Sequence, residues 1–275
     1  MDVRLIIIGG DMRMNGLARA AQRSGYACEQ VKTEKELLEL SGSADAAVLP
    51  WPRSFLGDRV LQTDIARDTL LEHLPACEYL MGGGLDGGGF PQAKRIVDPA
   101  KDEMLLAVNA KLTAEGATAA LLTGYPDALM GRTCLITGFG RIAQALTRRL
   151  AALELFVIVC ARNEQQMRMA HNLGAHPVPL QQLSSAAAQA DIVLNTIPAR
   201  VFGSDALAQM KPGVRYIELA SAPYGADPEL AAKLGVSMEI MSGIPGKYAP
   251  ERAGEALFDA LARAMAVKEA EKGAQ

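Results

Sequence analysis

The stretch Leu135-Ile136-Thr137-Gly138-Phe139-Gly140-Arg141-Ile142-Ala143 decides how the rest of the chain is interpreted. A short apolar run leads into Gly-x-Gly, and Ala143 stands where the third small residue of the dinucleotide-binding fingerprint is expected. The pattern predicts a strand, a tight turn at Gly138, and a helix over residues 141–152 whose N-terminal N–H groups face a diphosphate. Such turns also arise for packing alone. We predict a dinucleotide site, with the cofactor contacted by Gly138, Phe139, Gly140, Arg141 and Ile142.

The end of the next predicted strand, residues 155–160, bears on which dinucleotide is bound. Folds specific for NAD usually place Asp or Glu there, about 20 residues past the glycines, to bind the ribose 2′-hydroxyl. Here the strand runs into Cys160-Ala161-Arg162-Asn163, and Glu164 comes only after it. Arg162 can pair with a 2′-phosphate through two charge-assisted hydrogen bonds. We therefore predict NADP, with NAD as the alternative if Arg162 is only a solvated arginine at a helix start.

Length and composition fit a two-domain enzyme. The 275 residues suffice for two α/β domains with sizeable cores. An aromatic content of 5% and a net charge of −3 argue against nucleic-acid binding. No apolar stretch reaches the ~18 residues of a membrane span, and the N-terminal run is too short for a signal sequence. We expect a cytoplasmic protein that does not bind membranes.

The four cysteines, Cys28, Cys77, Cys134 and Cys160, are scattered and have no C-x-x-C spacing. They also lie far from paired histidines in the sequence, so neither a metal site nor a disulfide framework is indicated. We expect small buried hydrophobic side chains at these positions.

Strands alternate with helices along the chain, which predicts doubly wound parallel sheets. In the first part we expect strands at 3–8, 27–31 and 45–49, a helix at 14–24, and a capping box formed by Thr33 and Glu36. In the second part we expect strands at 133–137, 155–160, 175–178, 191–196, 215–220 and 236–240.

Two long helical segments complete this organisation. Residues 102–122 join the two parts, and a last helix at 250–268 has one apolar stripe and is expected to cross back onto the first. We therefore predict an α/β protein with two doubly wound parallel-sheet domains and crossing helices. An N-terminal substrate-side domain spans 1–108 plus 250–275, and a Rossmann dinucleotide-binding domain spans 109–249.

Two loops of the first domain are candidates for function. Arg13 follows Gly9-Gly10-Asp11 at the carboxyl end of the first strand, where open α/β sheets bind ligands, and could hold a carboxylate. The alternative is a surface arginine on a helix. The glycine-rich segment 82–89 lacks Gly-Lys-Ser/Thr, which excludes a triphosphate-binding P-loop. We expect a poorly constrained surface loop there, with a mobile lid as the alternative.

Several stretches together resemble the A subunit of dipicolinate synthase, from spore-forming bacteria. They are Gly9-Gly10-Asp11-x-Arg13, Asn109-Ala110-x-x-Thr113-Ala114-Glu115-Gly116-Ala117, Gly138-Phe139-Gly140-Arg141, Asn195-Thr196-Ile197-Pro198-Ala199, Glu218-Leu219-Ala220-Ser221 and Gly243-Ile244-Pro245-Gly246. The resemblance implies a hydroxyacid-dehydrogenase-like architecture. It also implies NAD(P)-dependent oxidation of dihydrodipicolinate to pyridine-2,6-dicarboxylate in the mother cell during sporulation, beside a flavoprotein-like B subunit, and we expect an oligomer.

The chain departs from that family at four positions. Ala143 and Glu218 stand where Gly and Asp are typical, Tyr224 where the second residue of Pro-Gly-Gly is typical, and Leu112 where Pro is typical. The longer Glu218 and the bulky Tyr224 bear on the shape of the pocket and so on the exact substrate.

Candidate catalytic groups follow from the chemistry of such a substrate. None of His73, His171 and His176 falls at a predicted cleft position, which argues against alcohol oxidation through a histidine. Aromatisation of a dihydropyridine needs a weaker acid–base group than alcohol oxidation does, because orientation of the substrate can supply most of the catalysis. We predict Glu115 as the base, although a solvent-exposed helix carboxylate is equally consistent, with Asn109 and Thr113 beside it.

Two carboxylates on the substrate call for hydrogen-bond donors. We predict Arg13, Ser221 and Lys247 as substrate-binding residues, in a cleft between the two domains. Asn195, Thr196 and Pro198 end a strand and are predicted to contact the nicotinamide ribose. The loop 243–246 either approaches the nicotinamide or is a plain turn.

The interpretation favoured by the sequence is an NADP-dependent oxidoreductase that aromatises dihydrodipicolinate. One alternative is a different small-acid dehydrogenase on the same scaffold. The other is a non-catalytic dinucleotide-binding partner of a second protein chain.

Overall fold

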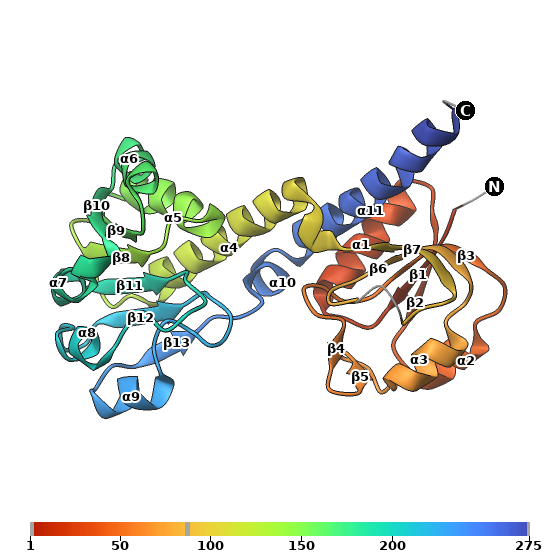
Figure 1. Cartoon of the computed structure of the whole chain (residues 1–275), viewed down its shortest axis with the longest axis horizontal. Helices are drawn as coiled ribbons and strands as arrows, with labels where there is room; N and C mark the ends of the chain where they lie inside the picture. The colour runs from red at the N-terminus through yellow and green to blue at the C-terminus, as the bar shows by residue number, and fades with distance from the viewer. Residues whose placement is uncertain (1–2, 86–88, 274–275) are drawn as a thin grey trace. The chain divides into compact units, whose positions relative to one another are not determined.

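The computed structural model describes residues 3–85 and 89–273, with side chains up to residue 266. The chain forms two compact units (Figure 1). The first consists of Met1–Asn109 and Pro245–Gln275, and the second of Ala110–Ile244. Each has a parallel sheet with helices on both faces, which confirms the predicted α/β class with two doubly wound sheets.

The sheet of the first unit has five parallel strands in the order β2-β1-β3-β6-β7. The central strand β1 is buried from Leu5 to Ile8, as its continuous apolar run predicts. The strands are β1 (Arg4–Ile8), β2 (Ala27–Val31), β3 (Ala44–Val48), β6 (Cys77–Met81) and β7 (Ala93–Val97). The first three of these strands were predicted from the sequence, whereas β6 and β7 were not.

Helices cover both faces of this sheet. On one face α1 (Met12–Arg23) and α11 (Pro250–Gly273) share a core with β1 and β3. On the other lie α2 (Glu34–Glu39), α3 (Arg67–His73) and the small hairpin of β4 (Phe55–Leu56) and β5 (Arg59–Val60). The predicted capping box is confirmed: Thr33 accepts from the backbone of Glu36, whose carboxylate accepts from the backbone N–H of Thr33. A 3-10 turn at Pro99–Lys101 precedes α4.

Helices α1 and α11 cross at very short range because glycines stand at the crossing. A Cβ on Gly254 would lie 2.2 Å from the carbonyl oxygen of Arg13 and 2.4 Å from the backbone nitrogen of Leu17. A Cβ on Gly16 would lie 2.7 Å from the carbonyl oxygen of Pro250. The C-terminal helix is therefore an integral part of the first unit.

The sheet of the second unit has six parallel strands in the order β10-β9-β8-β11-β12-β13. All six were predicted, with ends shifted by no more than two residues. They are β8 (Thr133–Thr137), β9 (Phe156–Ala161), β10 (His176–Pro179), β11 (Ile192–Asn195), β12 (Arg215–Glu218) and β13 (Met238–Ile240). The strand order reverses between β8 and β11, which creates the switch point where such sheets bind ligands.

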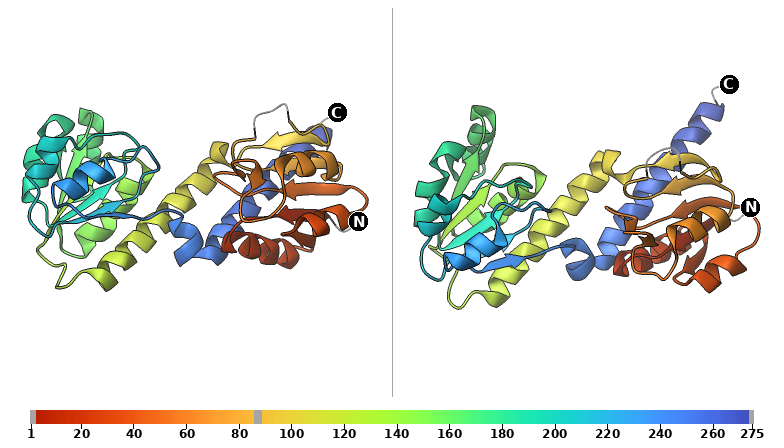
Figure 2. Two further views of the ribbon diagram at one scale, coloured as in Figure 1. Left: turned by 90° about the horizontal axis from the view of Figure 1, so that it is seen from below. Right: turned by 60° about the horizontal axis from the view of Figure 1, so that its bottom comes forward.

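Two layers of helices enclose this second sheet (Figure 2). The layer that includes the C-terminal part of α4 (Glu103–Gly124) also contains α5 (Arg141–Ala152) and α6 (Glu164–Asn172). The opposite layer contains the 3-10 turn η2 (Leu180–Gln182), α7 (Leu183–Gln189), α8 (Ser204–Ala208) and α9 (Pro228–Lys233). The short α10 (Ile244–Tyr248) follows β13.

Among the described residues, no helix is long and apolar enough to cross a membrane. The described part of the chain likewise holds no group of three or more His, Cys, Asp or Glu suited to a metal ion. Cys77, Cys134 and Cys160 are buried as predicted, while Cys28 is half-buried. Burial raises the pKa of Cys77 to about 11, so this thiol stays protonated at neutral pH.

The glycine-rich segment after β6 is better ordered than predicted at its start. Gly82 and Gly83 are buried, and the N–H of Gly83 donates to Ser54 Oγ at 3.0 Å. A Cβ on Gly83 would lie 2.2 Å from the carbonyl oxygen of Pro52. The prediction of a poorly constrained loop is therefore wrong for these two glycines, because a second loop packs against them. Residues 86–88 lie outside the described residues.

Candidate dinucleotide site

The turn after β8 has the geometry of a phosphate-binding turn. Gly138 has φ of 82°, a conformation that glycine adopts without strain. A Cβ there would lie 2.9 Å from Ile197 Cγ1, in the loop after β11. The packing of that loop therefore also requires glycine at position 138. Ala143, in the first turn of α5, is fully buried in the core of this unit. The turn is thus held from below by the sheet and by the loop that follows β11.

Gly140 is the residue with open space around it. It is the N-cap of α5 and provides no side chain to cap the helix, and a Cβ placed on it would meet no atom within 4 Å. The N-terminus of this 12-residue helix therefore has room for an anion that approaches the backbone closely.

The neighbouring predicted residues have different surroundings. Phe139 is buried in the core, so only its backbone can face a ligand, whereas Arg141 is exposed and Ile142 half-buried.

Arg162 lies just beyond β9, at the predicted position. It is exposed, and no carboxylate in the described part of the chain pairs with its guanidinium. Asn163 caps α6, and Glu164, the nearest carboxylate in sequence, pairs with Arg168 at 3.2 Å. The end of β9 therefore presents a cation, and the acidic residue that follows is engaged elsewhere.

A buried hydrogen-bond network joins the ends of β8, β11 and β12. Thr137 Oγ1 donates to Asn195 Oδ1, and Asn195 Nδ2 donates to Glu218 Oε1 at 2.6 Å. Both Asn195 and Glu218 are completely buried. Asn195 Nδ2 also donates to the carbonyl oxygen of Ile197, and Asn195 Oδ1 accepts from the Ile197 N–H. Asn195 therefore fixes the loop that follows it, and its side chain is not exposed to a ligand.

Thr196 and Pro198 occupy the surface of the same loop. Thr196 is half-buried and its hydroxyl donates to the carbonyl oxygen of Thr137 at 2.7 Å, while Pro198 is exposed. Of the three residues predicted for the nicotinamide ribose, these two lie where a ligand can reach them.

The loop after β12 is fastened to the same network. The Gly225 N–H donates to Glu218 Oε2 at 2.8 Å, and a Cβ on Gly225 would lie 2.5 Å from the Asn195 amide. The Gly225 carbonyl accepts from the N–H groups of Val201 and Phe202. Ser221 lies exposed on this loop, as required of a substrate-binding residue. Tyr224 has φ of 64°, so it adopts a left-handed conformation at a position where the related family typically has glycine.

In the first unit, Arg13 is held by Asp11 at the start of α1. The Arg13 Nε–H lies 2.8 and 3.0 Å from the two carboxylate oxygens of Asp11, and Arg13 is only 8% exposed. A Cβ on Gly246 would lie 2.7 Å from Asp11 Oδ2, so α10 packs directly on this pair. Burial would raise the pKa of Asp11, but the hydrogen bonds and charge of Arg13 outweigh it and lower that pKa. No described residue engages the two Nη groups of Arg13.

The remaining predicted residues are dispersed. Glu115 is exposed on α4, whereas Thr113 is buried and Asn109 half-buried on the same helix. Lys247 is exposed on α10. All three histidines are exposed.

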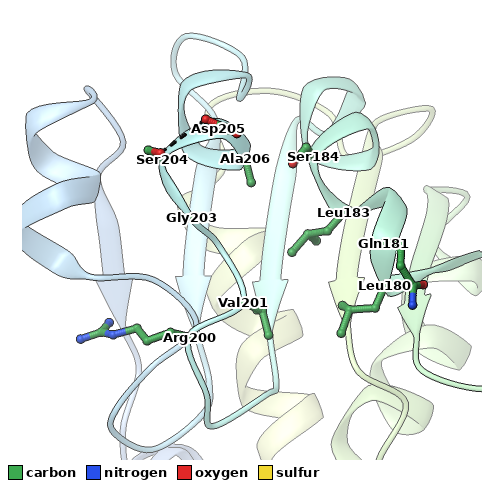
Figure 3. A pocket seen from close by; sticks show the side chains of 10 residues that line it. All are labelled: Leu180, Gln181, Leu183, Ser184, Arg200, Val201, Gly203, Ser204, Asp205 and Ala206. Atoms are coloured by element: carbon green, nitrogen blue, oxygen red, sulfur yellow. Dashed lines mark hydrogen bonds between the residues drawn. The ribbon is translucent and has the colours of Figure 1, made fainter.

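A cavity of about 460 Å³ lies on the second unit between η2, α7 and the segment that leads into α8 (Figure 3). Leu180, Leu183 and Val201 supply apolar surface, and Ser184, Ser204 and Asp205 supply polar groups. Arg200 at its margin bonds the carbonyl oxygen of Ala226 and the carboxylate of Asp227. Sequence reasoning missed this cavity because its walls follow two different strands and carry no recognisable motif.

Known proteins resemble this chain in both sequence and fold. Residues 109–235 match the family model of the D-isomer specific 2-hydroxyacid dehydrogenase, NAD binding domain. The A subunit of dipicolinate synthase from Bacillus subtilis (strain 168) is 30% identical over 183 residues, which is 66% of this chain. That match spans 62% of the relative, less than two thirds of its length.

Solved structures resemble the fold over nearly the whole chain. Dipicolinate synthase A from Bacillus subtilis has a TM-score of 0.82 at 24% identity, covering 98% of both chains. The corresponding protein from Bacillus halodurans has a TM-score of 0.80 at 24% identity, covering 96% of this chain and 98% of that one. The apo-structure of D-lactate dehydrogenase from Escherichia coli has a TM-score of 0.63 at 15% identity, covering 98% of both chains.

Proposed function

We propose that this chain belongs with the dipicolinate synthase A subunits and oxidises dihydrodipicolinate to dipicolinate with NADP as the hydride acceptor. The observation that carries the proposal is the turn at Gly138 and Gly140. It stands at the switch point of a six-stranded parallel sheet, and the open N-terminus of α5 follows it. The dinucleotide-binding domain is common to this family, whereas the reaction and the choice of NADP are our inferences.

Residues of the second unit support binding of NADP. The backbone from Gly138 to Ile142 would hold the diphosphate, and Arg162 would hold the 2′-phosphate through its guanidinium fork. Thr196 and Pro198 would contact the nicotinamide ribose, with Asn195 fixing their loop from below. When bound, the cofactor supplies an acceptor for a hydride. If NAD is used instead, Arg162 has no phosphate to bind.

Arg13 is the strongest candidate for binding a substrate carboxylate. Its Nε is occupied by Asp11, so the guanidinium is fixed in orientation and its two Nη groups form a fork that matches a carboxylate. Dihydrodipicolinate has two carboxylates, and we propose Ser221 and Lys247 as further donors to them. Because Arg13 is buried and is held by Asp11, it differs from a solvated surface arginine.

The proton released on aromatisation requires only a modest base, because the reaction is driven by formation of the aromatic ring. We propose Glu115 for this role, with Asn109 and Thr113 as polar neighbours along α4. Glu115 is exposed on this helix, where a substrate can reach its carboxylate. The relative from Bacillus subtilis is one subunit of its enzyme, and we propose that this chain also works beside a second protein chain.

Turnover by the purified chain tests the proposal. Protein mixed with NADP⁺ and freshly formed dihydrodipicolinate should produce NADPH and dipicolinate in equal amounts, both measured by absorbance. Binding of NADP⁺ without turnover, with or without a partner chain, would contradict the oxidation and favour a non-catalytic role. Turnover of other small acids at a higher kcat/KM would instead indicate a different dehydrogenase.

A further inference from the structure

Glu218 is a buried carboxylate that no cation among the described residues pairs with. It is completely inaccessible to solvent, and no basic side chain in the described part of the chain forms an ion pair with it. A buried charge is costly unless it is paired, so structures usually place a cation beside it. A bound ligand that carries a positive charge is one source of the missing countercharge.

Four hydrogen-bond donors surround Glu218 and favour its ionised form. Oε1 accepts from Asn195 Nδ2 at 2.6 Å and from the Ala220 N–H at 3.0 Å. Oε2 accepts from the Gly225 N–H at 2.8 Å and from the Tyr216 hydroxyl at 3.3 Å. Burial raises the pKa of Glu218, and these four donors oppose the rise. A protonated carboxyl would need an acceptor, and of these four neighbours only the Tyr216 hydroxyl can accept a hydrogen bond as well as donate one.

The position of Glu218 indicates which ligand lies above it. It ends β12 and pairs in register with Asn195 at the end of β11. In a doubly wound dinucleotide fold, the first half of the sheet binds the adenosine and the second half binds the nicotinamide nucleoside. Here β8, β9 and β10 form the first half, so β11 and β12 lie under the nicotinamide.

We propose that Glu218 supplies the countercharge for the oxidised nicotinamide ring, so that the protein binds NADP⁺ more tightly than NADPH. The inference rests on the proposed function, because it assumes that the second unit binds this cofactor. The ring is positively charged when oxidised and neutral when reduced, so the field of Glu218 favours only the oxidised form. The field acts through the buried Asn195 and Gly225, which both donate hydrogen bonds to Glu218, in an interior that screens charges weakly.

Calorimetric titration with NADP⁺, NADPH and 2′,5′-ADP, which lacks the nicotinamide, tests this role. Glu218→Gln should lose about fivefold to tenfold in affinity for NADP⁺, the size that Coulomb's law gives for charges separated by one layer of protein. Its affinity for NADPH and for 2′,5′-ADP should change much less. A purely structural role would weaken all three ligands alike, and that result would overturn the proposal.

Tyr216→Phe is the matched control, because it removes one donor to the same carboxylate and keeps the charge. Its ratio of NADP⁺ to NADPH affinity should equal that of the wild type, and a collapsed ratio would contradict the charge role. The wild type provides a second test if Glu218→Gln does not fold. Equal or tighter binding of NADPH, with 2′,5′-ADP still bound, would overturn the role of Glu218 alone. Failure to bind any of the three would overturn the proposed function as well.

Discussion

At the residue scale, Arg162 is the side chain on which cofactor choice depends. It is exposed at the end of β9, and Glu164, which follows shortly after it, is paired with Arg168. Arg162→Ala should weaken NADP⁺ binding by roughly tenfold or more, since a hydrogen-bonded charge pair contributes about 1.5–3 kcal/mol. NAD⁺ binding should stay unchanged. Equal affinities of the wild type for NADP⁺ and NAD⁺, measured by calorimetry, would contradict this assignment.

Arg13 is the side chain on which binding of the substrate depends in our proposal. Arg13→Ala should lower kcat/KM for dihydrodipicolinate by roughly tenfold to a hundredfold, through loss of a fully charged hydrogen bond. NADP⁺ affinity should be unaffected, because the proposed cofactor residues belong to the other unit. Arg19→Ala is the control, since Arg19 is an exposed arginine on the same helix that pairs with Glu251. Steady-state kinetics in which the two variants are equal would refute the role of Arg13.

At the scale of elements, the crossing of α1 and α11 depends on glycine. Gly254→Ala would force a Cβ to within 2.4 Å of backbone atoms of α1, which cannot move without shifting the helix. We expect a loss of about 1–3 kcal/mol in the free energy of unfolding, the usual cost of overpacking. Gly89→Ala in the same unit, where the added Cβ meets open space, should change stability little. Urea unfolding that shows equal midpoints for both variants would contradict the close crossing.

Local signals predicted the elements better than they predicted the contacts between them. The six strands of the second sheet follow from short apolar runs, and α5 follows directly from the Gly-x-Gly turn. Strand β7 was missed because it has exposed Lys94 and Arg95 and lacks an apolar run. Strand β6 was missed although its last three residues are buried. The network of Asn195 and Glu218 joins residues 23 positions apart, and nothing in either local sequence announces it.

The same limit applies to the candidate site. Gly138 and Gly140 could be found from spacing, since the fingerprint is a local pattern. The burial of the Asn195 side chain in hydrogen bonds within the protein could not be found in this way. It depends on how the ends of three strands align in the sheet. The resemblance to the A subunit of dipicolinate synthase, carried by short motifs, is confirmed by the sequence and structural comparisons.

At the scale of the whole molecule, acid should destabilise the protein through carboxylates that are paired in the folded state. Burial would raise the pKa of Asp191, but hydrogen bonds from Lys211 and Thr133, with nearby positive charge, lower it below 3.8. A lowered pKa contributes stability above the unfolded value, and this contribution disappears as the pH falls through the folded value. Asp191→Asn should therefore flatten the dependence of unfolding free energy on pH below about 4. An unchanged pH dependence in urea titrations would contradict this.

If the turn between β8 and α5 holds the diphosphate of the cofactor, a side chain at Gly140 should block binding, and Gly140→Val is the variant to measure. Gly140 and Gly203 are both helix N-caps in the second unit, with φ of −79° and −80°, and both face open space. Valine at either position should therefore leave the fold intact, and thermal unfolding checks this. Calorimetry should show that Gly140→Val loses NADP⁺ binding while Gly203→Val keeps it. Folded Gly140→Val protein that binds NADP⁺ as tightly as the wild type would contradict the account.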